Sequence, residues 1–107
     1  LALVAIRLNA LANGVAVDAI DRDVTRHDTE DDVILAGDVC YERAMAEAVW
    51  PWLQTQARRG VAVVLADPGR AYKPSTGLVE LARYRVPTSL ELEDRAERET
   101  VVYRVAG

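Results

Sequence analysis

The sequence predicts an α/β fold in which parallel strands are joined by crossover helices and the chain ends in an antiparallel hairpin. Two apolar runs, residues 33–36 and 61–66, show no alternation with polar residues. Such continuous runs are typical of strands buried on both faces of a parallel sheet. A strongly helix-forming segment, residues 42–59, lies between them, and two further β-prone segments close the chain. Strands that alternate with helices favour a parallel sheet, and two successive strands favour a hairpin.

The size and composition of the chain limit its class. A chain of 107 residues that is 50% hydrophobic and 28% charged has material for one core and one domain. Its 17 acidic and 13 basic residues give a net charge of -4, which argues against nucleic acid as the main partner. No apolar run approaches the ~20 residues of a membrane span. The single cysteine, Cys40, excludes an internal disulfide and fits a reducing compartment. We therefore expect a cytoplasmic protein without a membrane segment.

The first third of the chain predicts a helix, a strand and a loop. Residues 2–13 are apolar around much of a helical wheel, and Gly14 stands where a glycine commonly ends a helix. We expect this helix to pack on a larger surface. Residues 15–20 form a short β-prone run. Residues 21–32 carry eight charged side chains among twelve, which indicates a solvated loop.

The helix predicted over residues 42–59 contains an internal proline. Pro51 removes a backbone hydrogen bond and crowds the preceding turn, so we expect a kink or a break near Trp50. Trp50 and Trp52 are expected to pack the helix against the sheet. Gly60 ends the helix and leads into the second apolar strand.

The last third predicts a loop, a short helix and two strands. Residues 67–76 contain two prolines and a glycine and are expected to be loop. A short helix is expected over residues 77–83. Strands are expected over residues 84–92 and 100–105, joined by a charged turn at residues 94–99.

Acidic residues follow each of the first three predicted strands. Asp21 and Asp23 follow the first, Asp38 follows the second, and Asp67 with Arg70 follows the third. Ligands of open α/β sheets bind outside the carboxyl ends of the strands. A carboxylate there can accept a hydrogen bond from a ribose, an adenine amino group or a substrate amine. The alternative is purely structural, because Asp is also common at strand ends and helix caps.

Two other chemically capable residues receive structural interpretations. His27 stands in the charged loop without a second His or Cys at metal-ligand spacing, so we expect it to be solvated. The same loop lacks the glycine and terminal Glu of a calcium loop, and no metal site is expected. Cys40 has no nearby His and is expected to be a small buried side chain.

The segment DVILAGDVCY, residues 32–41, carries a family resemblance. Its D-x-x-Y, from Asp38 to Tyr41, resembles the signature after the fourth strand of seven-strand S-adenosylmethionine-dependent methyltransferases. The ordered set GDVCYE, DPGRAY and VPT is similar to the electron-transfer-flavoprotein beta-subunit lysine methyltransferases. These are relatives of the ribosomal-protein lysine methyltransferases, and the resemblance covers essentially the whole chain.

The resemblance implies a Rossmann-like methyltransferase fold with the sheet order 3-2-1-4-5-7-6. Residues 1–107 would then be a single partial domain, the carboxy-terminal portion of that fold. The glycine-rich cofactor loop and the first two strands have no counterpart in this sequence. The implied cofactor is S-adenosyl-L-methionine, and the implied partner is a protein substrate that presents a lysine side chain.

The resemblance also implies roles for individual residues. Asp38 and Tyr41 would line the methyl-transfer pocket, where the carboxylate holds the incoming amine and the ring offers a π face to a cation. Asp23 would accept a hydrogen bond from the adenine amino group, and Ala36 and Gly37 would contact the cofactor. For the loop after the fifth strand, Asp67 and Arg70 are candidates for substrate or cofactor contact, with a structural Arg–Asp pair as the alternative.

The sheet order makes a prediction about edges. Without the family's first two strands, either residues 33–36 form an exposed apolar edge or residues 15–20 move across to pair with them. Pro87 would lie on the outer strand at the other side, where a strand proline is tolerated.

Two other functions stay open at this point. One is a non-catalytic α/β module that packs against a partner through its exposed sheet edge. The other is a methyltransferase of the same fold that acts on a small molecule.

Overall fold

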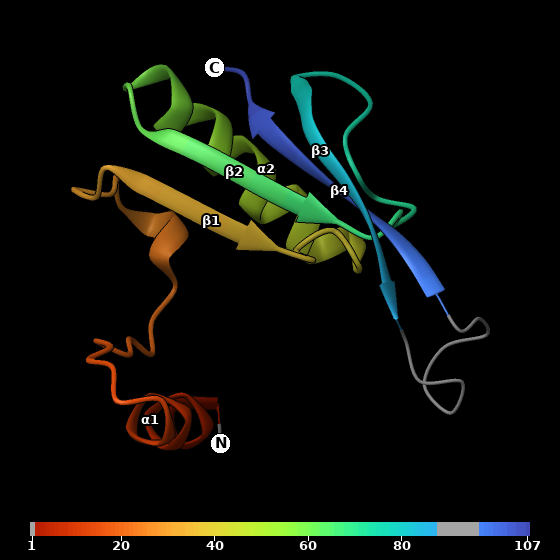
Figure 1. The fold of residues 1–107 in the computed structure, drawn as a ribbon. Coiled ribbons are helices and arrows are strands. Elements are labelled where there is room, and N and C mark those ends of the chain that lie inside the picture. Colours follow the sequence, from red (N-terminus) through yellow and green to blue (C-terminus); the bar gives the residue numbers. More distant parts are fainter. Residues whose placement is uncertain (1, 88–96) are drawn as a thin grey trace.

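The computed structural model describes residues 2–87 and 97–107 as a four-stranded sheet, one long helix packed on it and a separate amino-terminal helix (Figure 1). The elements in chain order are α1 (Ala2–Ala12), the short 3-10 helix η1 (Val24–Arg26), β1 (Val33–Gly37), α2 (Arg43–Arg58), β2 (Ala62–Asp67), β3 (Leu78–Pro87) and β4 (Glu97–Val105).

The sheet has the strand order β1-β2-β4-β3. β1 and β2 are parallel, with Ile34 opposite Val63, and α2 is the crossover between them. β4 is antiparallel to both β2 and β3. This confirms the predicted parallel pair and the closing hairpin. The order also corresponds to the 4-5-7-6 part of the order that the resemblance implies, so the mixed sheet is compatible with a Rossmann-like fragment.

The core lies between α2 and one face of the sheet. Along β2 every second side chain is buried, and Val63 and Leu65 meet Leu53 of α2 there. Full burial of such a side chain contributes roughly 1.5–3 kcal/mol to folding. Trp50 and Trp52 are half-buried and pack against the same cluster, as predicted.

A buried glutamine fastens the loop before β1 to α2. Gln56 accepts a hydrogen bond from the amide N–H of Thr29 at 3.0 Å and donates one to the carboxylate of Asp28 at 2.9 Å. Its side chain is fully buried, and such a polar group is tolerated because both ends of its amide are satisfied.

α2 runs without interruption through Pro51, so the predicted alternative of a break is wrong. Pro51 lies on the exposed face of the helix, as does Glu47, the residue whose carbonyl loses its donor. Water can therefore satisfy that carbonyl, and packing of the opposite face keeps the helix together.

The first helix forms where it was predicted, but it is not packed. α1 ends before Gly14, which has a φ of +64°, and the amide N–H of Val15 donates to the carbonyl of Ala10 at 3.0 Å. No residue of α1 is buried, and apolar side chains such as Leu8 and Leu11 are exposed. The larger surface on which we expected it to pack is therefore not supplied by the described residues.

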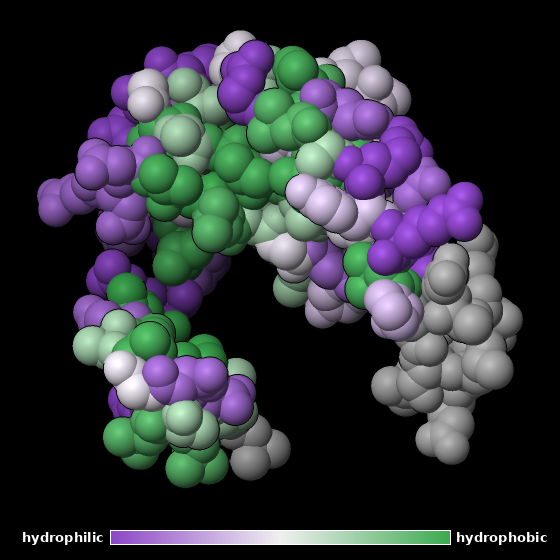
Figure 2. All heavy atoms as spheres, viewed as in Figure 1, coloured by the Kyte–Doolittle hydropathy of each residue, from purple (hydrophilic) through white to green (hydrophobic). Residues whose placement is uncertain are grey.

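The strand predicted over residues 15–20 is wrong, because this segment has no regular structure. A strand needs a hydrogen-bonded neighbour, and none of the described residues provides one for it. Two edge arrangements were expected, and the structure has the one in which residues 33–36 are exposed at the edge of the sheet. β1 is an outer strand, and Leu35 is 78% exposed on it. Figure 2 shows apolar residues gathered over β1 and β2 on the face turned toward the viewer.

The helix predicted over residues 77–83 is also wrong, because β3 begins at Leu78. Pairing with β4 overrides the local helical preference, with an irregularity in the register between Glu80 and Ala82. β3 is described as far as Pro87, which lies on an edge strand as predicted. The remainder of that predicted strand, residues 88–92, lies outside the described residues.

The start of the last strand differs from the prediction as well. β4 begins at Glu97, so residues 97–99 are strand and not part of the predicted turn at 94–99. Residues 94–96 of that turn lie outside the described residues. Across 2–87 and 97–107, no helix combines the length and the apolar character that crossing a bilayer requires.

Candidate active site

Three of the residues predicted to be functional meet at one edge of the sheet. Asp38 directly follows β1 and Asp67 ends β2, and parallel strands bring their carboxyl ends to the same edge. Arg70, on the loop after β2, joins them. Its Nε and Nη2 donate to the two carboxylate oxygens of Asp38, each at 2.8 Å. This bidentate pair fixes both side chains in one geometry.

The backbone at Asp38 adopts an unusual conformation. Its φ of +51° lies in the left-handed region, and it is the one non-glycine residue with a positive φ in the described part of the chain. Its amide N–H donates to the carbonyl of Ala66 at 2.9 Å. Asp tolerates this region better than most residues, but the conformation still costs about 1 kcal/mol or more. Such strain is commonly found at functional positions.

Neighbouring positive charges keep Asp38 ionised. The hydrogen bonds from Arg70 lower the pKa of its carboxyl group, and the charge of Arg98 lowers it further, whereas partial burial acts in the opposite direction. The side chain is still 44% exposed. A carboxylate with a low pKa is a weak base but a good partner for a cation, so Asp38 is suited to hold an ammonium group and not to deprotonate it.

Asp67 shapes the turn that carries Arg70. Its side chain is buried, and one carboxylate oxygen accepts from the amide N–H groups of Gly69 at 2.8 Å and Arg70 at 2.9 Å. The other oxygen, Oδ1, is buried and has no hydrogen-bond partner within the described residues. The hydrogen bonds of Asp67 therefore hold the loop in shape. This is a structural role, which the sequence analysis gave as the alternative to ligand binding.

Cys40 is close enough to Asp38 and Asp67 for their charges to act on its thiol. It is buried in the core, as predicted. Burial raises the pKa of its thiol, and the charges of Asp67 and Asp38 raise it further. The thiol is therefore protonated near neutral pH, which makes it a poor nucleophile.

The other residues predicted at the end of β1 differ in how exposed they are. Ala36 is half-buried and packs against the core, whereas Tyr41 is more than half exposed in the turn before α2. Gly37 is paired with Ala66, and a Cβ built on Gly37 would meet no atom within 4 Å. The end of β1 is therefore accessible to a ligand from at least one side.

Asp23 is not part of this group. It caps η1, where its carboxylate accepts from the amide N–H of Thr25 at 3.0 Å and from the hydroxyl of Thr25 at 2.6 Å. Those hydrogen bonds, together with the charge of Arg26, lower the pKa of Asp23. The prediction that Asp23 emerges from a strand end fails because residues 15–20 are not a strand.

Sequence reasoning missed three residues that reach the same edge. Arg98 donates from Nε to the carbonyl of Pro68 at 2.8 Å. Lys73 donates to the hydroxyl of Tyr103 at 3.1 Å, and its Nζ lies 5.0 Å from the centre of that ring. The available signal was topological. A last strand antiparallel to its neighbour must begin near that neighbour's carboxyl end, but the charged pattern of residues 94–99 predicted a turn at Arg98.

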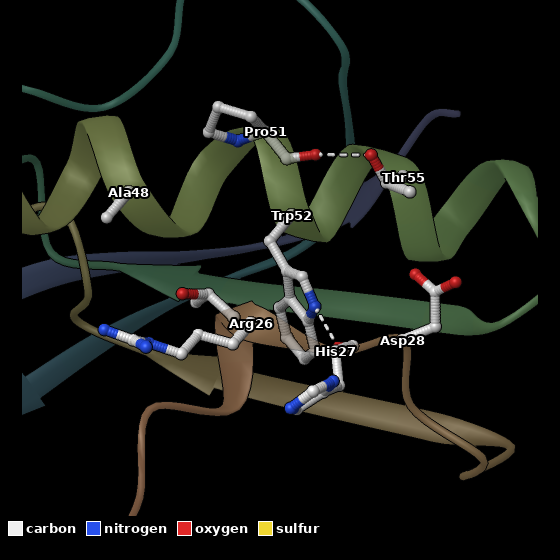
Figure 3. Close-up of a pocket in the computed structure, with 8 residues that line it drawn as sticks. Arg26, His27, Asp28, Ala48, Pro51, Trp52 and Thr55 are labelled. Carbon is white, nitrogen blue, oxygen red and sulfur yellow. Dashed lines mark hydrogen bonds between the residues drawn. The ribbon is translucent and has the colours of Figure 1, made fainter.

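A separate hollow lies between η1 and α2. Its volume is about 550 Å³, and Trp52 and His27 contribute to its lining, with the indole N–H donating to the His27 carbonyl at 2.8 Å (Figure 3). The imidazole of His27 is exposed, as predicted. None of the residues gathered at the strand ends lines this hollow. Among residues 2–87 and 97–107, no three His, Cys, Asp or Glu side chains are placed to hold a metal ion.

Comparison with known proteins links the chain to one enzyme class. It is 30% identical over 111 residues to the electron transfer flavoprotein beta subunit lysine methyltransferase of Danio rerio. The alignment covers 97% of this chain and 43% of that protein, so the chain spans less than half the length of the curated relative. No family model matches the chain, and no solved structure matches it. The similarity to this methyltransferase thus extends over nearly all of the chain.

Proposed function

We propose that this chain supplies part of an S-adenosyl-L-methionine-dependent N-methyltransferase that acts on a lysine of a protein substrate. The observation that carries this proposal is the 30% identity to a lysine methyltransferase over 97% of the chain. The meeting of Asp38, Asp67 and Arg70 at one sheet edge supports it, because ligands of α/β sheets bind at such edges.

The end of β1 is proposed to form one side of the cofactor site. The open space over Gly37 leaves room beside the backbone of Ala36 and Gly37, which would line one wall of the cofactor site. Asp23 is proposed to accept a hydrogen bond from the adenine amino group, and its carboxylate is 56% exposed beside the bonds that it already accepts. S-adenosyl-L-methionine would supply an electrophilic methyl group on a positively charged sulfur.

Asp38 is proposed to hold and orient the substrate amine. A lysine amine attacks only after it loses its proton, because an ammonium has no lone pair. Asp38 has a lowered pKa, so it would position the nitrogen and leave the proton to pass to water. Holding the two reacting atoms in line accounts for most of what a protein contributes to such a displacement.

Tyr41 and the loop after β2 complete the proposed arrangement. The exposed ring of Tyr41 follows Asp38 by three residues and can present a π face to a cation. Asp67 would act on the substrate through the turn that it caps, and Arg70 would contact the substrate directly.

The proposal is tested by offering the full chain of the protein radiolabelled S-adenosyl-L-methionine together with a cell lysate. Label in protein, recovered as methyllysine after hydrolysis, is the expected result. Label in the small-molecule fraction alone would instead favour a small-molecule methyltransferase of the same fold.

A non-catalytic module is the second candidate, because Leu35 and the free edge of β1 offer an apolar surface to a partner. Calorimetric titration of the full chain with S-adenosylhomocysteine separates the two functions. Saturable heat supports the enzyme. If the titration gives no heat and the transfer assay gives no label, the interaction module is the better explanation.

A further inference from the structure

We propose that the protein substrate carries, beside its target lysine, an extended segment with prolines and an acidic side chain, and that this segment binds in a groove between α2 and the loop after β2. The inference rests on the proposed function and names its substrate class more narrowly. The groove has a volume of about 510 Å³. Its walls are α2, around Trp50, and residues 72–76 of the loop.

Two aromatic rings and two prolines give the groove an apolar lining. Trp50 comes from α2 and Tyr72 from the loop, and Pro51 and Pro74 complete the lining. The indole of Trp50 packs against Gly77, because a Cβ built on Gly77 would lie 3.1 Å from Cζ2 of that ring. Extended proline-rich segments dock in grooves lined by aromatic rings, since their conformation is formed before binding.

The indole of Trp50 offers a hydrogen-bond donor to such a segment. The indole N–H of Trp52 donates to the carbonyl of His27, whereas that of Trp50 has no acceptor in the described part of the chain. Oδ1 of Asp67 is the one side-chain nitrogen or oxygen there that is both fully buried and without a partner, so the nitrogen of Trp50 is reachable from solvent. A polyproline II segment makes no internal hydrogen bonds, and one of its carbonyls can therefore accept from Trp50.

Arg43 gives the groove a positive charge that can pair with an acidic side chain. Its guanidinium lies over the ring of Tyr72, with Cζ 5.6 Å from the ring centre. Within residues 2–87 and 97–107 Arg43 forms no ion pair, not even with Glu47 one turn further along α2. Lys73 also lines the groove, but its ammonium donates to the hydroxyl of Tyr103. A carboxylate of the ligand would thus find a charge-assisted partner in Arg43.

The groove begins beside the proposed site of methyl transfer. Arg43 is the first residue of α2 and follows Tyr41 by two residues, and Tyr72 follows Arg70 by two residues. Arg70 is the partner of Asp38, which is proposed to hold the substrate amine. A substrate that places its lysine at Asp38 can therefore lay the adjoining residues of its chain in the groove.

Peptide binding tests the inference without depending on catalysis. The first fluorescein-labelled peptide has one lysine next to a segment with two prolines and one glutamate. Glutamine replaces the glutamate in the second peptide, and alanine replaces both prolines in the third. Fluorescence anisotropy with the full chain is expected to give about tenfold weaker binding of the second and third peptides at low salt. The effect of the glutamine should decrease as salt is added. Equal affinity of the first peptide and either of the others would overturn the inference.

Variants connect the two preferences to the groove. Arg43→Gln should remove most of the preference for glutamate and leave the preference for proline. Trp50→Phe keeps an aromatic ring but removes the N–H donor, so it should weaken binding of the first peptide about fivefold. Arg7→Gln and Trp52→Phe are the matched controls, because both residues lie outside the groove. Circular dichroism verifies that each variant folds. A glutamate preference that survives Arg43→Gln, or equal effects of the two tryptophan substitutions, would overturn the inference.

One further peptide separates this inference from the proposed function. In it, norleucine replaces the lysine while the prolines and the glutamate remain. If this peptide keeps both preferences but the full chain transfers no methyl group to the lysine peptide, then the groove binds such a segment and the methyltransferase assignment fails. If methyl groups are transferred equally well to lysine peptides with and without the prolines and the glutamate, only the inference about the groove fails.

Discussion

At the scale of single residues, the proposed reaction depends on how Asp38 is charged and held. Two hydrogen bonds from Arg70 lower the pKa of Asp38 in the folded protein. Because the folded pKa lies below the unfolded one, the pair stabilises the fold above the unfolded value of about 3.9. That contribution disappears as the pH falls through the lower folded pKa. Water screens this partly exposed pair, so it contributes no more than about 1 kcal/mol.

The first prediction removes the guanidinium and leaves Asp38 in place. In Arg70→Gln the pKa of Asp38 should rise toward its ordinary value, because the largest cause of the lowering is gone. A carboxyl-detected NMR titration measures this, with Arg104→Gln as the control that should not move it. An unchanged pKa in Arg70→Gln would show that another group governs Asp38.

The second prediction concerns Asp67, the buried residue that caps the turn after β2. Asp67→Ala removes the acceptor of two amide N–H groups, those of Gly69 and Arg70. We expect the free energy of unfolding to fall by about 1–3 kcal/mol, as measured by urea denaturation. The exposed substitution Asp18→Ala should change it by less than about 0.5 kcal/mol. Equal effects of the two substitutions would argue against the cap.

At the scale of elements, segments with strong patterns of their own were predictable. The apolar runs before Gly37 and before Asp67 became parallel strands, and residues 42–59 became α2 within one residue at each end. Residues 15–20 and 77–83 were wrong for opposite reasons. The first run has strand propensity but no neighbour to pair with, and the second has helix propensity but pairs with β4. Pairing partners are a tertiary property that a local pattern does not contain.

The third prediction tests why α2 tolerates its proline. Pro51→Ala restores a donor within an exposed helix face and removes the ring from the preceding turn. The free energy of unfolding should rise by about 1–3 kcal/mol in urea denaturation. Glu47→Ala, at an exposed position one turn earlier, should change it by less than about 0.5 kcal/mol. A loss of stability in Pro51→Ala would mean that the ring itself packs usefully.

At the scale of the whole molecule, topology decided which site residues could be foreseen. Asp38, Asp67 and Arg70 were predictable as a group because parallel strands bring their carboxyl ends together. Arg98 was not, since its position follows from the antiparallel register of β4 beside β2. Asp23 lies at the cap of η1 and not at a strand end, because residues 15–20 form no strand.

The fourth prediction concerns the exposed edge and open face of the sheet. Leu35 is 78% exposed on the outer strand β1, a surface that favours edge-to-edge association. Leu35→Lys should therefore lower the self-association of this chain in sedimentation equilibrium without lowering its melting temperature. Arg7→Lys, on α1, is the control for the added lysine. Unchanged association would mean that this edge is not a contact surface.

The most direct measurement compares methyl transfer by the full chain of the protein with Asp38 and with Asp38→Asn. Asparagine tolerates the positive φ and keeps the shape of the side chain, so the fold should be retained. We expect transfer to lysine to fall by about 100-fold or more, whereas affinity for S-adenosylhomocysteine and the transfer rate of Asp31→Asn should stay close to those of the unchanged protein. Transfer by Asp38→Asn at the unchanged rate would contradict the assignment of this strand end as the site of the reaction.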